Sequence, residues 1–102
     1  MKHSRFLIAA VMTAASVAAH AQSVDPLTVR SWAASCSNCH GTNGVAQSGM
    51  ESLAGANKDD MYKKLMDFKT GKKPATVMHQ LSKGYSDQQL EAISAYFASQ
   101  KK

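Results

Sequence analysis

The run Cys36-Ser37-Asn38-Cys39-His40 contains both cysteines of this 102-residue chain and one of its four histidines. On a helix, steps of three and four residues return to the same side, so residues 36, 39 and 40 share one face. Two thiols on that face can form thioethers with the two vinyl groups of one haem, and the adjacent imidazole can reach the iron. Because the pattern C-x-x-C-H is typical of c-type haem attachment, the sequence predicts one covalent haem c with its iron, attached through Cys36 and Cys39 and ligated by His40.

Three other interpretations of this run fit the sequence less well. A redox-active C-x-x-C pair belongs beside a βαβ pattern, and no convincing strand pattern is present. A zinc site would combine Cys36, Cys39, His40 and His79, but ligands from adjacent residues converge poorly on one tetrahedral ion, and the close histidine pair of zinc fingers is absent. A plain disulfide would leave a small core without further stabilisation.

The amino-terminal segment has the organisation of a secretory signal peptide. Lys2 and Arg5 precede an apolar stretch over residues 6–17, and Ala19-His20-Ala21 fits a small-x-small cleavage site. We predict that residues 1–21 are cleaved and that residues 22–102 form one monohaem domain in the periplasm. The stretch is shorter than the roughly 20 residues that cross a bilayer, so no stable membrane insertion is expected after cleavage. An uncleaved membrane anchor is the alternative.

Composition narrows the class of protein further. Hydrophobic residues make up 44% of the chain, which excludes a disordered or collagen-like sequence. The length allows one small domain and excludes a multidomain enzyme. After cleavage the chain would be near the lower size limit for an independent apolar core, so a metal or cofactor is expected to stabilise it. The excess of 12 basic over 7 acidic residues shrinks when Lys2 and Arg5 leave, and it does not indicate nucleic-acid binding.

The remaining sequence predicts an all-α domain. Asp25 followed by Pro26 is typical of a helix start, and the helix is expected over residues 27–39. The glycine-bearing run over residues 41–44 ends it. Asn57 offers a cap for a second helix, whose apolar residues have helical rather than alternating spacing. Gly71 and Pro74, which follow it, are helix-stopping residues.

Two more helices are expected in the last third of the chain. Residues 75–81 are long enough for two helical turns before Gly84. Ser86 and Gln89 have the spacing of a capping box, which predicts a final helix that ends near residue 100. That helix is expected to bury one apolar stripe, at the helical spacing of three, four and seven residues, formed by Leu90, Ile93, Tyr96 and Phe97.

Spacing alone leaves open the second axial ligand of the haem iron. Met61 and Met66 fall within the amphipathic pattern of the second helix, where thioethers suit core packing. Met50 lies in a loop with no helix to hold it. Met78 lies in a short segment between two glycine breaks, apart from any long apolar stripe. His79 is the rival ligand, and bis-histidine ligation would give a lower reduction potential than methionine.

Five short runs occur in a characteristic order. They are Cys36-x-x-Cys39-His40, Leu53-Ala54-Gly55, Phe68-Lys69-Thr70-Gly71, Pro74-Ala75-Thr76-Val77-Met78 and Gly84-Tyr85-Ser86-Asp87. With these runs, the sequence from about residue 32 to residue 100 resembles class I c-type cytochromes. More narrowly, it is similar to the cytochrome subunit of flavocytochrome c sulfide dehydrogenase and to the domains of cytochrome c4.

The resemblance implies a fold and a set of ligands. The fold would be that of a class I cytochrome c, with about four helices wrapped around one covalently bound haem. Cys36 and Cys39 would hold the haem, His40 would be the proximal iron ligand, and Met78 the distal one. Relatives with two fused domains have two haems, whereas this chain has one attachment motif.

The resemblance also predicts contacts around the haem. The first and last helices would cross near Trp32 and the pair Tyr96-Phe97. Relatives usually carry a proline where this chain has Glu51, in the loop beneath the proximal histidine. A backbone carbonyl in that loop is still expected to accept the imidazole N–H and so orient the ligand.

An iron with both axial positions filled has no open site for a substrate, which predicts an electron-transfer protein that is not itself an enzyme. The resemblance implies that a flavoprotein sulfide dehydrogenase subunit is the electron donor. A free soluble electron shuttle is the main alternative. A ligand-sensing or peroxidase-like protein would require loss of the Met78 bond. The half of the chain that contains Met78 is rich in lysine, which suits either a rim that steers acidic redox partners or a solvated face: Lys63, Lys64, Lys69, Lys72, Lys73 and Lys83.

Overall fold

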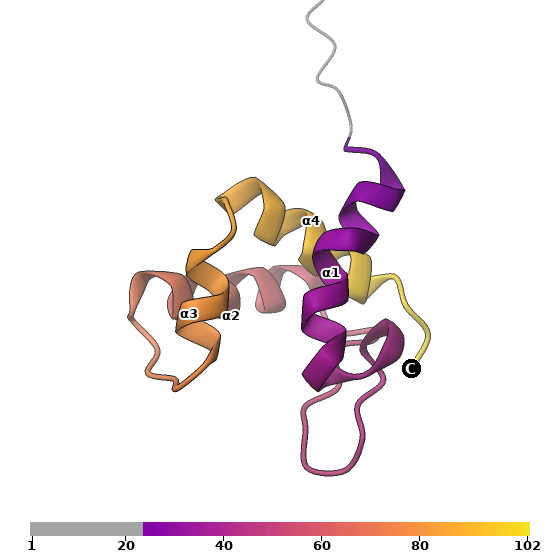
Figure 1. Cartoon of the computed structure of the whole chain (residues 1–102), viewed down its shortest axis with the longest axis horizontal. Coiled ribbons are helices and arrows are strands. Elements are labelled where there is room, and N and C mark those ends of the chain that lie inside the picture. The colour runs from indigo at the N-terminus through magenta and orange to yellow at the C-terminus, as the bar shows by residue number, and fades with distance from the viewer. Residues whose placement is uncertain (1–23) are drawn as a thin grey trace, which may run out of the picture.

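The computed structural model describes residues 24–102, and within them it contains four α-helices, one short 3-10 turn and no strand. This confirms the all-α prediction. The elements are α1 (Pro26–His40), η1 (Thr42–Gly44), α2 (Lys58–Thr70), α3 (Met78–Lys83) and α4 (Asp87–Ala98) (Figure 1). The predicted signal peptide, residues 1–21, lies outside the described residues.

Capping side chains fix the start of three helices, as the sequence predicts. The Asp25 carboxylate accepts a hydrogen bond from the Thr28 backbone N–H at 3.0 Å, and Pro26 occupies the first position of α1. The Asn57 side chain accepts from a backbone N–H in the first turn of α2, and Ser86 forms both bonds of a capping box at the start of α4. These bonds satisfy backbone donors that a helix start leaves without partners.

The third helix differs from its prediction. It begins at Met78 and ends at Lys83, so the expected range of residues 75–81 is wrong at both ends. The backbone N–H groups of Gln80 and Leu81 both bond to the Val77 carbonyl, so the hydrogen-bonded turns begin there. Before that point Ala75 is irregular, and Thr76 and Val77 form a bend. Consequently Met78 lies in the first turn of a helix.

The core lies where α4 crosses α1 and packs along α2 (Figure 1). Ala33, Met61, Ile93 and Phe97 form one buried cluster, and the Phe97 side chain is fully buried. Trp32 and Tyr96, both half-buried, pack against this cluster. The expected crossing of the first and last helices near these aromatic residues is therefore observed.

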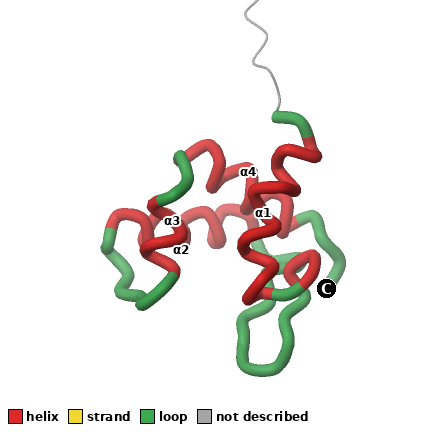
Figure 2. Tube along the Cα trace, in the orientation of Figure 1, coloured by secondary structure: helices red, strands yellow, loops and turns green. Residues whose placement is uncertain are grey.

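The short helix α3 packs against α2, on the opposite side of the domain from the carboxyl end of α1 (Figure 2). Two long loops complete the domain: one joins η1 to α2 and extends beyond the end of α1, and the other joins α2 to α3. Among the described helices, none is long and apolar enough to cross a membrane.

Candidate cofactor site

A cavity of about 360 Å³ lies between the four helices. Residues from α1, α2, α3, α4 and both long loops line it. More than half of the lining residues are aliphatic, aromatic or methionine: Met50, Leu53, Met61, Leu65, Phe68, Val77, Met78, Leu81, Leu90, Ile93 and Phe97. All four residues predicted to hold the haem also line this cavity, although α1 and α3 are distant in sequence: Cys36, Cys39, His40 and Met78.

The two cysteines are free thiols on the last turns of α1. Cys36 is half-buried and Cys39 is exposed. Burial raises the pKa of the Cys36 thiol, which therefore stays protonated in its apolar surroundings. Within residues 24–102 no three histidine, cysteine or acidic side chains group closely enough to hold a metal ion. The zinc interpretation therefore finds no support in this part of the chain.

A backbone carbonyl orients the His40 imidazole. The Nδ1 atom lies 2.6 Å from the Glu51 carbonyl oxygen, and because a carbonyl can only accept, Nδ1 carries the proton and donates it. This leaves Nε2 as the unprotonated nitrogen, with its lone pair available to a metal. The carbonyl acceptor expected from the sequence is thus present, and Glu51 provides it.

The turn after α1 holds that acceptor loop in place. The Gly44 carbonyl accepts from the backbone N–H groups of Leu53 at 2.8 Å and Ala54 at 3.1 Å, which closes the loop that contains Glu51. Asn43 adopts a left-handed backbone, with φ of 54°, and its side-chain oxygen accepts from the Tyr96 hydroxyl at 3.1 Å. Sequence reasoning identified this turn only as a helix break and missed its link to α4.

The structure separates the five candidate distal ligands. Met66 and His79 are not among the residues that line the cavity. Met50 lines it but is adjacent to Glu51, the residue that contacts His40, and 46% of Met50 is exposed. Met61 is buried in the core cluster. Of the five, Met78 is the one that lines the cavity from α3.

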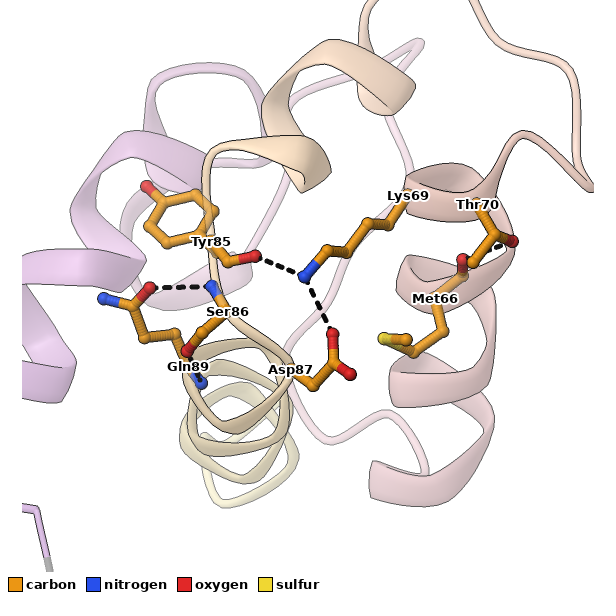
Figure 3. Close-up of polar contacts among 7 residues, drawn as sticks. All are labelled: Met66, Lys69, Thr70, Tyr85, Ser86, Asp87 and Gln89. Atoms are coloured by element: carbon orange, nitrogen blue, oxygen red, sulfur yellow. Dashed lines mark hydrogen bonds and ion pairs between the residues drawn. The ribbon is translucent and has the colours of Figure 1, made fainter.

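Tyr85 connects α1, which carries the two cysteines, to α2 and to the start of α4. Its ring lines the cavity, and its hydroxyl lies 2.5 Å from Ser35 Oγ and 3.3 Å from the Trp32 carbonyl oxygen, both on α1. Lys69 Nζ donates to the Tyr85 carbonyl at 2.8 Å and to Asp87 Oδ1 at 2.7 Å (Figure 3). This network joins α1, α2 and the start of α4 around the cavity. Sequence reasoning singled out the Gly84-Tyr85-Ser86-Asp87 run but did not predict these contacts.

Glu51 contributes its side chain as well as its carbonyl. Its Oε1 lies 2.9 Å from Lys64 Nζ on α2, and both residues line the cavity. Hydrogen bonding to this ammonium lowers the pKa of the Glu51 carboxyl, so it is ionised at neutral pH. Sequence reasoning did not anticipate this ion pair, because the two residues belong to separate elements.

The donor set fits a c-type haem. Two thiols and an imidazole lie on one wall of the cavity, a thioether lies on α3, and an apolar lining surrounds them. Thiols suit covalent attachment, while an imidazole and a thioether suit haem iron.

The comparisons with known proteins point the same way. Residues 29–101 match the cytochrome c family. The chain is 38% identical over 63 residues to the cytochrome subunit of sulfide dehydrogenase from Chlorobaculum tepidum, which covers 62% of this chain and 57% of that protein. It is 41% identical over 70 residues to cytochrome c4 from Pseudomonas aeruginosa, covering 68% of this chain and 35% of that one.

A third relative is the thiosulfate dehydrogenase electron acceptor of Stutzerimonas stutzeri, which is 32% identical over 65 residues. That match covers 62% of this chain and 30% of the relative. In all three cases the match spans less than two thirds of the curated relative.

Proposed function

The chain belongs to the cytochrome c family, with one covalent haem c, and on that premise we propose that it transfers electrons in the periplasm through a haem ligated by His40 and Met78. Thioethers to Cys36 and Cys39 would retain the cofactor. The observation that carries this proposal is the shared cavity, which His40 and the cysteines line from α1 and Met78 lines from α3. When bound, the haem supplies a reversible one-electron couple between ferric and ferrous iron.

The residues around the cavity support electron transfer over substrate chemistry. An imidazole and a thioether would fill both axial positions, so neither is left open for a substrate or for oxygen. The Glu51 carbonyl fixes the orientation of the imidazole, and the Tyr85 hydroxyl holds α1. Contacts that hold these groups in place favour a protein that only exchanges electrons, because little of the site would then have to move between oxidation states.

We propose a flavoprotein sulfide dehydrogenase subunit as the electron donor. The similarity to a cytochrome subunit of sulfide dehydrogenase supports this partner. Val77 and Leu81 line the cavity and are 55% and 41% exposed, so its rim offers apolar side chains for docking. Lys72 and Lys73, both exposed, precede Met78 in sequence and would attract an acidic partner.

Location and processing belong to the same proposal. Residues 1–21 would direct export and be removed, which leaves the monohaem domain of residues 22–102. The sequence pattern supports this, since a basic start, an apolar stretch and a small-x-small site follow in order. Covalent haem attachment to free thiols is compatible with that compartment.

The ligand assignment is tested with carbon monoxide and the reduced holoprotein. The wild-type protein should not bind carbon monoxide at neutral pH, because both axial positions are filled. Met78→Ala should bind it and change its visible spectrum, whereas His79→Ala, at a residue that does not line the cavity, should behave as the wild type. An unchanged spectrum in Met78→Ala would show that another residue is the distal ligand.

The partner is tested by size-exclusion chromatography of the native periplasmic fraction, with haem and flavin absorbance followed together. Co-elution of haem and flavin at a mass well above this chain supports a subunit of a sulfide-oxidising complex. Haem that elutes alone at the size of the processed chain supports the free electron shuttle instead. Absence of the protein from this fraction would contradict the periplasmic assignment.

A further inference from the structure

The cavity wall contains one acidic and one basic side chain. Among the described residues that line it, Glu51 and Lys64 are the only ones with a carboxylate or an ammonium group. Their Oε1 and Nζ atoms are 2.9 Å apart. The other three ion pairs of the described chain join residues that do not line the cavity: Lys58–Glu91, Lys63–Asp67 and Lys69–Asp87.

The Glu51–Lys64 pair lies between solvent on one side and the cavity on the other. The side chains of Lys64 and Glu51 are 41% and 63% exposed, so water screens them on one side. On the other side they border an apolar cavity, where charges act over a longer distance because little solvent screens them. Glu51 also provides the carbonyl that accepts from His40. The pair therefore lies on the same side of the cavity as the proximal ligand.

We propose that the Glu51–Lys64 pair is a charge-balancing element of the cavity wall, in which each partner offsets the effect of the other on the reduction potential of the bound haem. This inference rests on the proposed function, since it takes the haem to occupy this cavity. The carboxylate lowers the potential and the ammonium raises it. Together they leave the wall nearly neutral toward the cofactor.

The sign of each contribution follows from the charge change. Reduction adds one electron to the site, so a fixed negative charge nearby opposes reduction and a fixed positive charge favours it. Lys64→Gln removes the ammonium that bonds to the Glu51 carboxylate and should lower the potential. Only the weaker influence of His40 and Lys73 on that carboxylate then remains. Glu51→Gln leaves the ammonium uncompensated and should raise it, while the backbone carbonyl that orients His40 is kept. The double variant should return close to the wild-type value.

A purely structural role makes a different prediction. The ion pair joins the loop of Glu51 to α2, so its loss from either side would loosen the same loop. Loosening would affect His40 equally in both single variants, and their potentials would then move in the same direction. Opposite shifts therefore separate an electrostatic role from a mechanical one.

The test is a spectroelectrochemical titration of the haem-loaded variants at neutral pH and low ionic strength. The matched controls are Lys63→Gln and Asp67→Asn, which break a 2.7 Å ion pair on the same helix that does not line the cavity. We expect shifts of opposite sign for the Lys64 and Glu51 variants, larger than those of the controls. Both shifts should shrink as salt is added, because ions screen exposed charges.

Two outcomes would overturn the proposal: shifts of the same sign in the two single variants, or shifts no larger than in the controls. This test can fail independently of the test of the proposed function. The charge pair is tested by reduction potentials, whereas the distal ligand is tested by the visible spectrum of Met78→Ala. If Met78→Ala leaves the spectrum unchanged while the charge variants shift oppositely, the distal ligand is wrong and the charge pair stands. If the spectrum of Met78→Ala changes and the potentials of the charge variants do not shift, Met78 stands as the distal ligand and the charge-balancing proposal is wrong.

Discussion

Gly44 is a position where the structure has no room for a side chain. Its φ is +80°, in the left-handed region that favours glycine. A Cβ atom there would lie 2.7 Å from Cδ1 of Phe97 and 2.8 Å from the backbone nitrogen of Ala54. Neither neighbour can easily move, because the Phe97 ring is fully buried and the Ala54 nitrogen donates to the Gly44 carbonyl. Gly44→Ala should therefore destabilise the domain.

Two contributions set the size of the effect. A non-glycine residue in the left-handed region costs about 1–2 kcal/mol, and forcing extra atoms into a packed core costs about 1–3 kcal/mol. The free energy of unfolding should therefore fall by about 2–5 kcal/mol. For a small domain this is a large fraction of the total, which is about 5–15 kcal/mol.

Gly71→Ala is the matched control. Gly71 has a φ of +79°, no described atom lies within 4 Å of the point that a Cβ would occupy there, and the residue does not line the cavity. It should lose only the backbone contribution, about 1–2 kcal/mol. The measurement is urea unfolding of both holoproteins, followed by helical circular dichroism. With a slope of about 2 kcal/mol per molar urea, the midpoint of Gly44→Ala should lie about 0.5–1.5 M below that of Gly71→Ala. Equal midpoints would refute the steric argument.

Three smaller changes follow from other contacts. Tyr85→Phe removes a hydroxyl that contacts the Trp32 carbonyl, and should lower the free energy of unfolding by about 1 kcal/mol in urea titration while the ring still lines the cavity. Ser86→Ala removes the capping box of α4 and should cost about 1 kcal/mol in the same assay; no loss would mean that tertiary packing alone fixes this helix start. Lys63 lowers the pKa of Asp67 below its ordinary value of 3.8, so the stability that this carboxylate contributes is present above that pH and lost as the pH falls. Asp67→Asn should therefore show a smaller loss of stability than the wild type in unfolding measured from neutral to acid pH.

The helix boundaries that the sequence predicts correctly are those fixed by local bonds. Asp25, Asn57 and Ser86 each accept from a backbone N–H within three residues, so the residues that define the helix start are neighbours in the sequence. The start of α3 has no such side chain, because Val77 makes no side-chain cap bond. Its start is set by backbone bonds to the Val77 carbonyl. Because any residue type can form such bonds, the sequence carries no signal for this helix start.

The candidate site residues also fall into two groups, those that a local motif predicts and those that depend on the fold. Cys36, Cys39 and His40 follow from one local motif, because a helix brings residues at this spacing onto one face. Met78 could not be separated from its rivals by spacing, since the choice depends on which methionine lines the cavity from α3. The hydrogen bond between Tyr96 and Asn43 joins residues that are 53 positions apart in the sequence. A single contact over that separation produces no repeating pattern from which it could be predicted.

Glu51 shows that the group that orients His40 does not depend on the residue type at this position. The atom that orients His40 is a backbone carbonyl oxygen, which every residue type possesses. Proline at this position would restrict the backbone covalently, by fixing φ. Here the loop is restrained by two backbone bonds to the Gly44 carbonyl and by the ion pair between Glu51 and Lys64. The His40 ring is thus oriented without proline, by a loop that also places a pair of charges in the cavity wall. In the proposed haem site, those charges would act on the electron that the haem accepts.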